Sequence, residues 1–174
     1  GLATLHDLLI EELEDLHSAE TQLVRALPRL ARTASSGALR TAFDDHLVET
    51  KQQLRRLNDV FSRIGGDRHQ KKCKAMEGLL AEGRDTITED AEPAVHDAAL
   101  ISVAQRIEHY EIAAYGCARA FALLVGDHET AQSLEESLQE ESTADKRLTQ
   151  IAMSGLNQLA AAIAATPHVV RGDR

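Results

Sequence analysis

Four long stretches of this sequence place apolar residues alternately three and four positions apart. They cover about 4–33, 36–64, 93–125 and 128–153. This spacing puts the apolar side chains on one face of an α-helix, and such a face has to be buried against another element. The pattern therefore predicts an all-α protein built around four long amphipathic helices.

Residues that start or interrupt helices agree with these limits. Thr4 and Asp7 have the spacing of a capping box at the start of the first helix. Pro93 suits the first turn of the third helix, and Gly126 is typical of a helix end. Pro28 removes one backbone hydrogen bond, so it predicts a kink or a break in the first helix.

The connections predict the topology. A short turn at Gly37 joins the first two helices and makes them antiparallel. By contrast, 28 residues run from Gly65 to Glu92, and the apolar Met76 and Leu80 among them predict a short helix. A connection of that length can return along a helix of about 42 Å. We therefore expect a ferritin-like four-helix bundle, up-down-down-up with one long crossover.

The C-terminal part of the sequence predicts one further helix and a tail. Leu156, Leu159 and Ile163 have helical spacing after the fourth long helix. We expect a single ferritin-like domain over 1–166 and a flexible tail over 167–174.

Composition argues against several classes of protein. The net charge of −9 disfavours nucleic-acid binding, which relies on clustered Lys and Arg. The two cysteines, Cys73 and Cys117, form no C-x-x-C pair and are expected to be thiols in a reducing compartment. No apolar run approaches the roughly 20 residues that span a membrane. We expect a soluble cytoplasmic protein with no nucleic-acid or membrane partner.

Seven titratable residues interrupt the apolar faces of the four helices. They are Glu20 on the first helix, His46 and Glu49 on the second, Glu108 and Glu111 on the third, and Glu141 and Asp145 on the fourth. One of them on each helix lies close to the helix midpoint, so helices packed side by side bring these groups to one level. Pairs three or four positions apart share a face.

Six carboxylates buried together need a neutralising partner. Burying an ionised carboxylate is costly, like charges repel each other, and no Lys or Arg occupies these faces. Two divalent cations would offset most of the charge, and oxygen ligands with one imidazole suit iron or manganese better than structural zinc. We expect two Fe ions, with Mn as the alternative. A metal-free polar layer that fixes helix register stays open.

The sequence resembles the YciF-like stress-response family of the ferritin-like superfamily over nearly the whole domain. The motifs that carry the resemblance are Ser18-Ala19-Glu20, His46-Leu-Val-Glu49-Thr50, Cys73-Lys-Ala-Met-Glu-Gly-Leu, Asp97-Ala-Ala-Leu-Ile, Glu108-His-Tyr-Glu-Ile-Ala-Ala-Tyr-Gly116, and Glu140-Glu141 with Asp145. The resemblance implies a di-metal bundle related to rubrerythrin, a homodimer and a role in bacterial stress, without an established substrate.

The resemblance also implies roles for the candidate ligands. Glu20 would be the terminal carboxylate of the first helix, and His46 the sole nitrogen ligand. Glu49 and either Glu108 or Glu111 would bridge the two metals. The fourth helix would contribute its two acidic residues.

The ligand pattern departs from that of the wider superfamily. Di-iron bundles usually carry Glu-x-x-His on two helices. Here the second helix reads His46-x-x-Glu49, and the fourth reads Glu141-x-x-x-Asp145 without histidine. The nearest substitutes for these ligands are Gln53 and Glu140. Four other polar residues flank this level, and we expect them to be packing or surface residues; the alternative is that they donate hydrogen bonds to the ligands or, for the tyrosines, relay electrons. They are His17, His109, Tyr110 and Tyr115.

Two classes of function follow from the metal hypothesis. A di-iron centre would oxidise ferrous iron or reduce peroxide, as a ferroxidase or a peroxidase-like enzyme does, and sustained turnover would need an external electron donor because the chain lacks C-x-x-C. A manganese catalase or an iron-storage protein would share the fold. The alternative is a non-enzymatic stress scaffold that dimerises, with structural metal or none.

Overall fold

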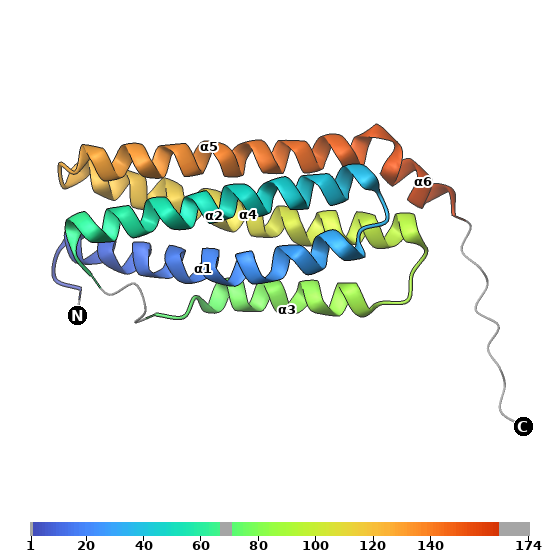
Figure 1. The fold of residues 1–174 in the computed structure, drawn as a ribbon, viewed down its shortest axis with the longest axis horizontal. Helices are drawn as coiled ribbons and strands as arrows, with labels where there is room; N and C mark the ends of the chain where they lie inside the picture. Colours follow the sequence, from blue (N-terminus) through green and yellow to red (C-terminus); the bar gives the residue numbers. More distant parts are fainter. Residues whose placement is uncertain (1, 67–70, 164–174) are drawn as a thin grey trace, which may run out of the picture.

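A computed structural model describes residues 2–66 and 71–163 of the chain, and all regular structure in that part is helical (Figure 1). The long helices are α1 (Leu5–Thr33), α2 (Gly37–Ile64), α4 (Pro93–Leu124) and α5 (His128–Ile151). The chain runs up α1, down α2, down α4 and up α5, and the crossover helix α3 (Lys74–Thr88) returns alongside α1. The predicted ferritin-like four-helix bundle is confirmed.

A buried carboxylate holds the turn between α1 and α2. The side chain of Asp97, near the start of α4, accepts hydrogen bonds from the backbone N–H groups of Ser35 at 2.9 Å and Ser36 at 2.6 Å. The Ser36 hydroxyl in turn accepts from the N–H of Leu39 and caps α2. Asp97 thus joins α4 to both helices of the turn and fixes their relative height.

The start of α1 is as predicted, and of the kink or break predicted at Pro28, the break does not occur. The capping box is present, with the Asp7 N–H donating to Thr4 Oγ1 at 3.1 Å and the Thr4 N–H donating to Asp7 at 2.9 Å. At Pro28, however, α1 continues without a break. Leu27 and Leu30 beside the proline are buried in the core. Their packing keeps the helix continuous despite the lost backbone hydrogen bond.

Beyond α5 the chain turns sharply. A π-helical segment η1 (Ala152–Leu156) contains Gly155 with φ of +122°, a conformation that favours glycine, and α6 (Asn157–Ala162) follows. The predicted further helix is therefore short. Leu156 is buried, but Leu159 is 65% exposed. The tail predicted over 167–174 lies outside the described residues.

None of the helices within residues 2–66 and 71–163 is long and apolar enough to cross a membrane.

A polar layer divides the apolar core into two halves. On α1, Glu20 lies between Leu16, which belongs to one half, and Leu23, which belongs to the other. The core changes from one half to the other at the corresponding level of the remaining long helices, near His46 on α2, Glu108 on α4 and Glu141 on α5. The predicted polar residues of the four helices therefore share one level.

Candidate metal centre

Four buried side chains from three helices converge in the polar layer. His46 of α2, Glu108 and Glu111 of α4, and Glu141 of α5 each offer one ligand atom, and these four atoms lie within 4.8 Å of one another. His46 Nε2 is 3.4 Å from Glu108 Oε1 and 3.7 Å from Glu141 Oε2. The structure thus brings four of the seven predicted ligands together.

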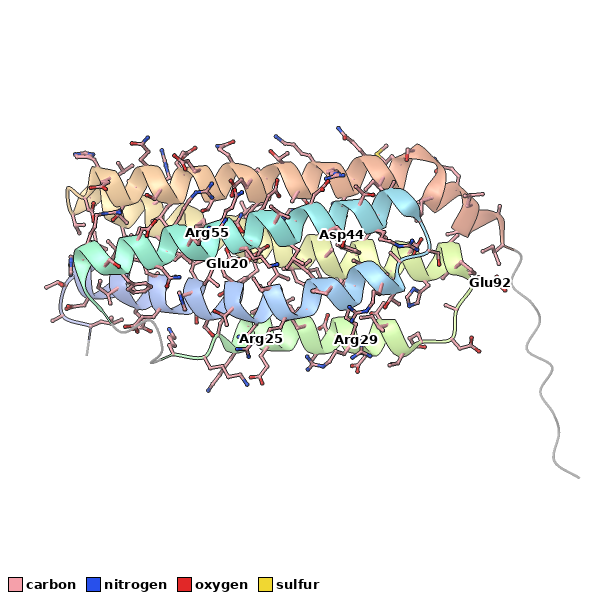
Figure 2. The ribbon with its side chains drawn as sticks, in the orientation of Figure 1. Glu20, Arg25, Arg29, Asp44, Arg55 and Glu92 are labelled. Carbon is pink, nitrogen blue, oxygen red and sulfur yellow. The ribbon has the colours of Figure 1, made fainter. Side chains whose placement is uncertain are left out.

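Glu20 adds a carboxylate from α1. Its side chain is fully buried and lies near the middle of the bundle (Figure 2). The hydroxyl of Tyr115 donates a hydrogen bond to Glu20 Oε1, whereas Oε2 has no partner. Burial is the largest cause of the raised pKa of Glu111, and the charge of Glu20 is the second largest. Glu20 therefore belongs to the same electrostatic cluster as the other four.

Buried polar atoms without hydrogen-bond partners gather at this level. Nearly all those found among the described residues belong to the layer, with Thr130 Oγ1 of α5 as the exception. They are Glu20 Oε2, His46 Nε2, both amide atoms of Gln53, Glu108 Oε2, and both carboxylate oxygens of Glu111 and Glu141. Such groups are costly unless something binds them. A cation that accepts electron pairs would satisfy nearly all of them.

The electrostatics of the layer favour protons or cations. Burial and then the charge of Glu141 raise the pKa values of Glu20 and Glu108 well above the usual value of 4.5. Burial lowers the pKa of His46, but the carboxylates of Glu141 and Glu49 outweigh this and give a net increase. Without a cation, the layer is stabilised by protons.

Glu49 lies at the edge of the cluster. Its side chain is 38% exposed, and Oε2 is 3.5 Å from His46 Nδ1. With His46, Ala144 and Glu108 it lines a small cavity of about 50 Å³. The cavity is formed by residues of α2, α4 and α5 and reaches the imidazole. Glu49 therefore lies at this cavity, the candidate passage from the surface to the layer.

Asp145 lies outside the converging group. Its Oδ1 accepts a hydrogen bond from Gln105 Nε2 at 3.0 Å and lies 3.3 Å from His109 Nε2. Its side chain is 20% exposed. Although Asp145 is one turn from Glu141, it faces the surface side of α4. To bind a metal in the layer it would have to give up these partners.

The polar layer also includes residues that the sequence placed in lesser roles or missed. Gln53 is fully buried, with neither amide atom paired. Arg56, which was not predicted, donates two hydrogen bonds of 2.7 Å to the carboxylate of Glu140. Glu140 therefore serves an ion pair beside the layer. Arg56 lies three residues after Gln53, a spacing that could have indicated its position.

A second polar network ties α3 to the bundle beside this layer. The hydroxyl of Tyr110 donates to Asp15 Oδ2 at 2.5 Å and lies 3.0 Å from the sulfur of Cys73, the N-cap residue of α3. Ser18 Oγ accepts a hydrogen bond from the Cys73 N–H at 2.9 Å. Tyr110 and Cys73 thus anchor the crossover. They do not belong to the converging carboxylates.

The fold and the site define the class of protein, a ferritin-like helical bundle with a buried cluster of carboxylates and one histidine. The chain belongs to the family described as "Domain of unknown function (DUF892)", which it matches over residues 4–161. It is 41% identical over 161 residues to "Protein YciF" of Escherichia coli strain K12. The aligned region covers 92% of this chain and 97% of that protein. The predicted resemblance is confirmed.

Solved structures agree with this assignment. The crystal structure of the E. coli stress protein YciF superimposes with a TM-score of 0.86 and 42% identity, covering 90% of this chain and 99% of that one. YcfI of Rhodopseudomonas palustris superimposes with a TM-score of 0.83 and 37% identity, covering 86% of this chain and 96% of that one. A ferritin-like, diiron-carboxylate protein from Bacillus anthracis strain Ames superimposes with a TM-score of 0.66 and 16% identity, covering 86% of this chain and 99% of that one. At this identity the likeness is one of fold.

Proposed function

We propose that this protein is a di-metal carboxylate protein of the bacterial stress response that binds two iron ions. The observation that carries the proposal is the group of buried, unpartnered carboxylate oxygens beside one imidazole. Carboxylates with one nitrogen ligand suit iron, or manganese as the alternative. The likeness to the diiron-carboxylate fold supports this choice.

The residues divide into a central group and an edge. In our proposal His46, Glu108, Glu111 and Glu141 hold the metals at the centre, because their ligand atoms already lie together. Glu20 completes the set from α1, held in place by Tyr115. The assignment of Asp145 as a ligand is the weakest, since its carboxylate already has partners on α4.

The surroundings suit a reaction with a small oxidant. Bound iron would supply redox chemistry toward O₂ or peroxide. The passage of about 50 Å³ beside Glu49 has room for a molecule of that size, and the apolar halves of the core exclude bulk water. We propose ferrous iron as the first substrate and an external electron donor for any sustained cycle. We also propose that the protein acts as a homodimer, as its family resemblance implies.

A metal-free scaffold is the competing function. The raised pKa values of Glu20, Glu108 and Glu111 mean that protonated carboxyls could hydrogen-bond to one another and fix helix register. In that case the layer would specify the fold and the dimer. The two functions differ in whether the layer takes up metal.

Metal content and oxidant consumption separate the two functions. The protein is isolated from cells without chelators, its metals are measured by mass spectrometry, and the apo form is titrated anaerobically with Fe²⁺ before exposure to O₂ or peroxide. We expect two iron ions per chain and consumption of oxidant. The Glu108→Ala variant should lose at least one ion while remaining helical. Fewer than one metal per chain with no consumption would favour the scaffold.

A further inference from the structure

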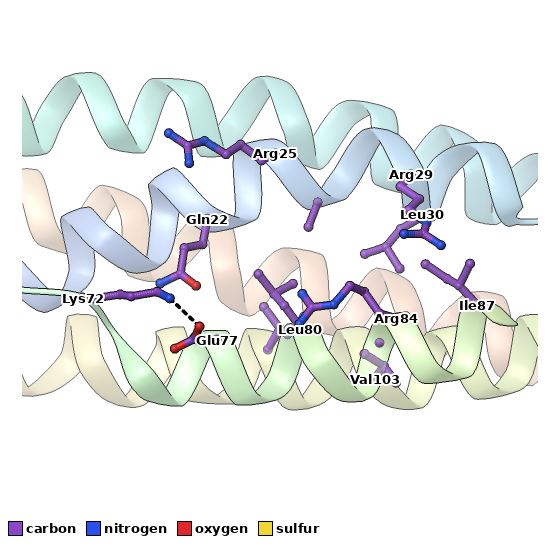
Figure 3. Close-up of a pocket in the computed structure, with 13 residues that line it drawn as sticks. Gln22, Arg25, Arg29, Leu30, Lys72, Glu77, Leu80, Arg84, Ile87 and Val103 are labelled. Carbon is purple, nitrogen blue, oxygen red and sulfur yellow. Dashed lines mark hydrogen bonds and ion pairs between the residues drawn. The ribbon is translucent and has the colours of Figure 1, made fainter.

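A separate cavity of about 390 Å³ lies between α1 and the crossover helix α3 (Figure 3). Its inner surface is apolar, formed by Ala26, Leu30, Leu80, Ile87, Val103 and Ile107. This volume falls within the range of small-molecule binding sites. None of the seven candidate metal ligands lines it. The cavity is therefore a second potential site, distinct from the polar layer.

The rim of the cavity is strongly basic. Arg25 and Arg29 extend from α1 and Arg84 from α3 (Figure 3). Within 2–66 and 71–163 these three arginines form no ion pair, whereas Lys72, also on the rim, pairs with Glu77. Five other arginines of the described chain have carboxylate partners, whereas Arg32, Arg40 and Arg55 have none within those residues. The paired ones are Arg56, Arg63, Arg106, Arg119 and Arg147.

Three unpaired arginines around one cavity contrast with the acidic character of the chain. The whole chain carries a net charge of −9, so an anion is repelled from most of its surface and attracted to this rim. Arginine binds a carboxylate through two parallel hydrogen bonds. The rim therefore suits an anionic head group, and the interior below it suits a hydrocarbon chain.

We propose that the cavity between α1 and α3 binds a single-chain fatty acid. The carboxylate would contact Arg29 and Arg84, and the alkyl chain would lie against Leu30, Leu80 and Val103. Gly83 shapes the site, because a Cβ at this position would lie 3.2 Å from Val103 Cγ1. Its absence lets α3 approach α4 and close the inner side of the cavity.

Calorimetric titration with dodecanoate below its micelle concentration tests the proposal on the whole chain. We expect one saturable site per chain, in both the apo and the iron-loaded protein. The double variant Arg29→Glu/Arg84→Glu should bind at least about tenfold more weakly, because each substitution replaces an attraction by a repulsion. Arg55→Glu is the matched control, since Arg55 is an exposed arginine of α2 without an ion pair in the described chain.

Two further measurements place the two ends of the ligand. Ala26→Phe adds a side chain at the wall of the cavity and should weaken dodecanoate binding by at least about tenfold while leaving the thermal unfolding transition in place. Butanoate, which has the carboxylate but little tail, should not bind detectably. Equal dodecanoate affinity of the wild type, the charge variant and Ala26→Phe, or an absence of saturable binding, would overturn the proposal. If butanoate bound as tightly as dodecanoate, the rim would be a general anion site, and the fatty-acid proposal would also be overturned.

Discussion

The hydroxyl of Tyr115 on α4 donates a hydrogen bond to the carboxylate of Glu20 on α1, and both side chains are fully buried. The two residues are 95 positions apart in the chain. This contact holds one oxygen of Glu20 and leaves the other free to face the polar layer. It joins the first helix to the site that the other three helices form.

Replacing Tyr115 by Phe tests this contact. The change leaves a buried carboxylate oxygen without a donor, so we expect the apo protein to lose about 1–3 kcal/mol of unfolding free energy. Iron affinity should fall by about tenfold or more, because residues that orient metal ligands commonly have effects of this size. Chemical denaturation and anaerobic iron titration measure the two effects.

Tyr110→Phe is the control for that variant. It also removes a phenol hydroxyl from α4, but that hydroxyl contacts Asp15 and Cys73. We expect a similar loss of stability with iron affinity unchanged. If both variants lost iron affinity equally, Tyr115 would have no special role at the site.

Replacing Glu141 by Gln separates stability from metal binding. Its charge raises the pKa values of Glu20 and Glu108, so it lies among carboxylates that repel it. We expect the apo variant to change in stability by less than about 1 kcal/mol at neutral pH, because the repulsion that it relieves is offset by the attraction to His46 that it loses. We also expect it to lose at least one iron ion. Glu140→Gln should do the opposite, losing the ion pair to Arg56 and keeping its iron. A Glu141→Gln variant with full iron content would remove Glu141 from the ligand set.

The stability of the apo protein should fall as the pH rises. Glu20, Glu108 and Glu111 have folded-state pKa values raised well above 4.5. Between 4.5 and those higher values the folded state holds more protons than the unfolded state, so the slope of unfolding free energy against pH is negative. The raised pKa of His46 acts in the same direction above 6.5. Denaturation of apo protein from pH 5 to pH 8 measures this slope.

Iron binding should reverse that behaviour. Metal ligands must be deprotonated, so binding releases protons and acidification releases metal. Holo protein is expected to gain stability with pH over the range in which apo protein loses it. Identical pH profiles of the two forms would show that the carboxylates do not hold the metal.

The passage beside Glu49 should control the rate of loading. Ala144 lines it, so Ala144→Leu should slow iron uptake in stopped-flow mixing without changing the final stoichiometry. Ala81→Leu, at a partly buried alanine of α3 away from the passage, serves as the control. Equal uptake rates in the two variants and the wild type would mean that iron enters elsewhere.

The sequence predicted the helices and the level of the polar layer because both depend on local periodicity and helix length. It could not predict the orientation of Asp145, because Gln105 and His109 on another helix decide which way that carboxylate points. The contact between Tyr115 and Glu20 depends on how α1 and α4 pack, which spacing along one helix does not report. The uninterrupted α1 at Pro28 likewise reflects packing of the neighbouring leucines.

Anomalous X-ray diffraction at the iron edge, from crystals of protein loaded anaerobically with Fe²⁺, tests the central claim most directly. We predict two iron peaks in the polar layer, bound by His46, Glu108, Glu111 and Glu141, with Glu20 contacting at least one of them. A fully loaded solution sample whose crystals show no iron in this layer, or show it only at surface carboxylates, would contradict the account.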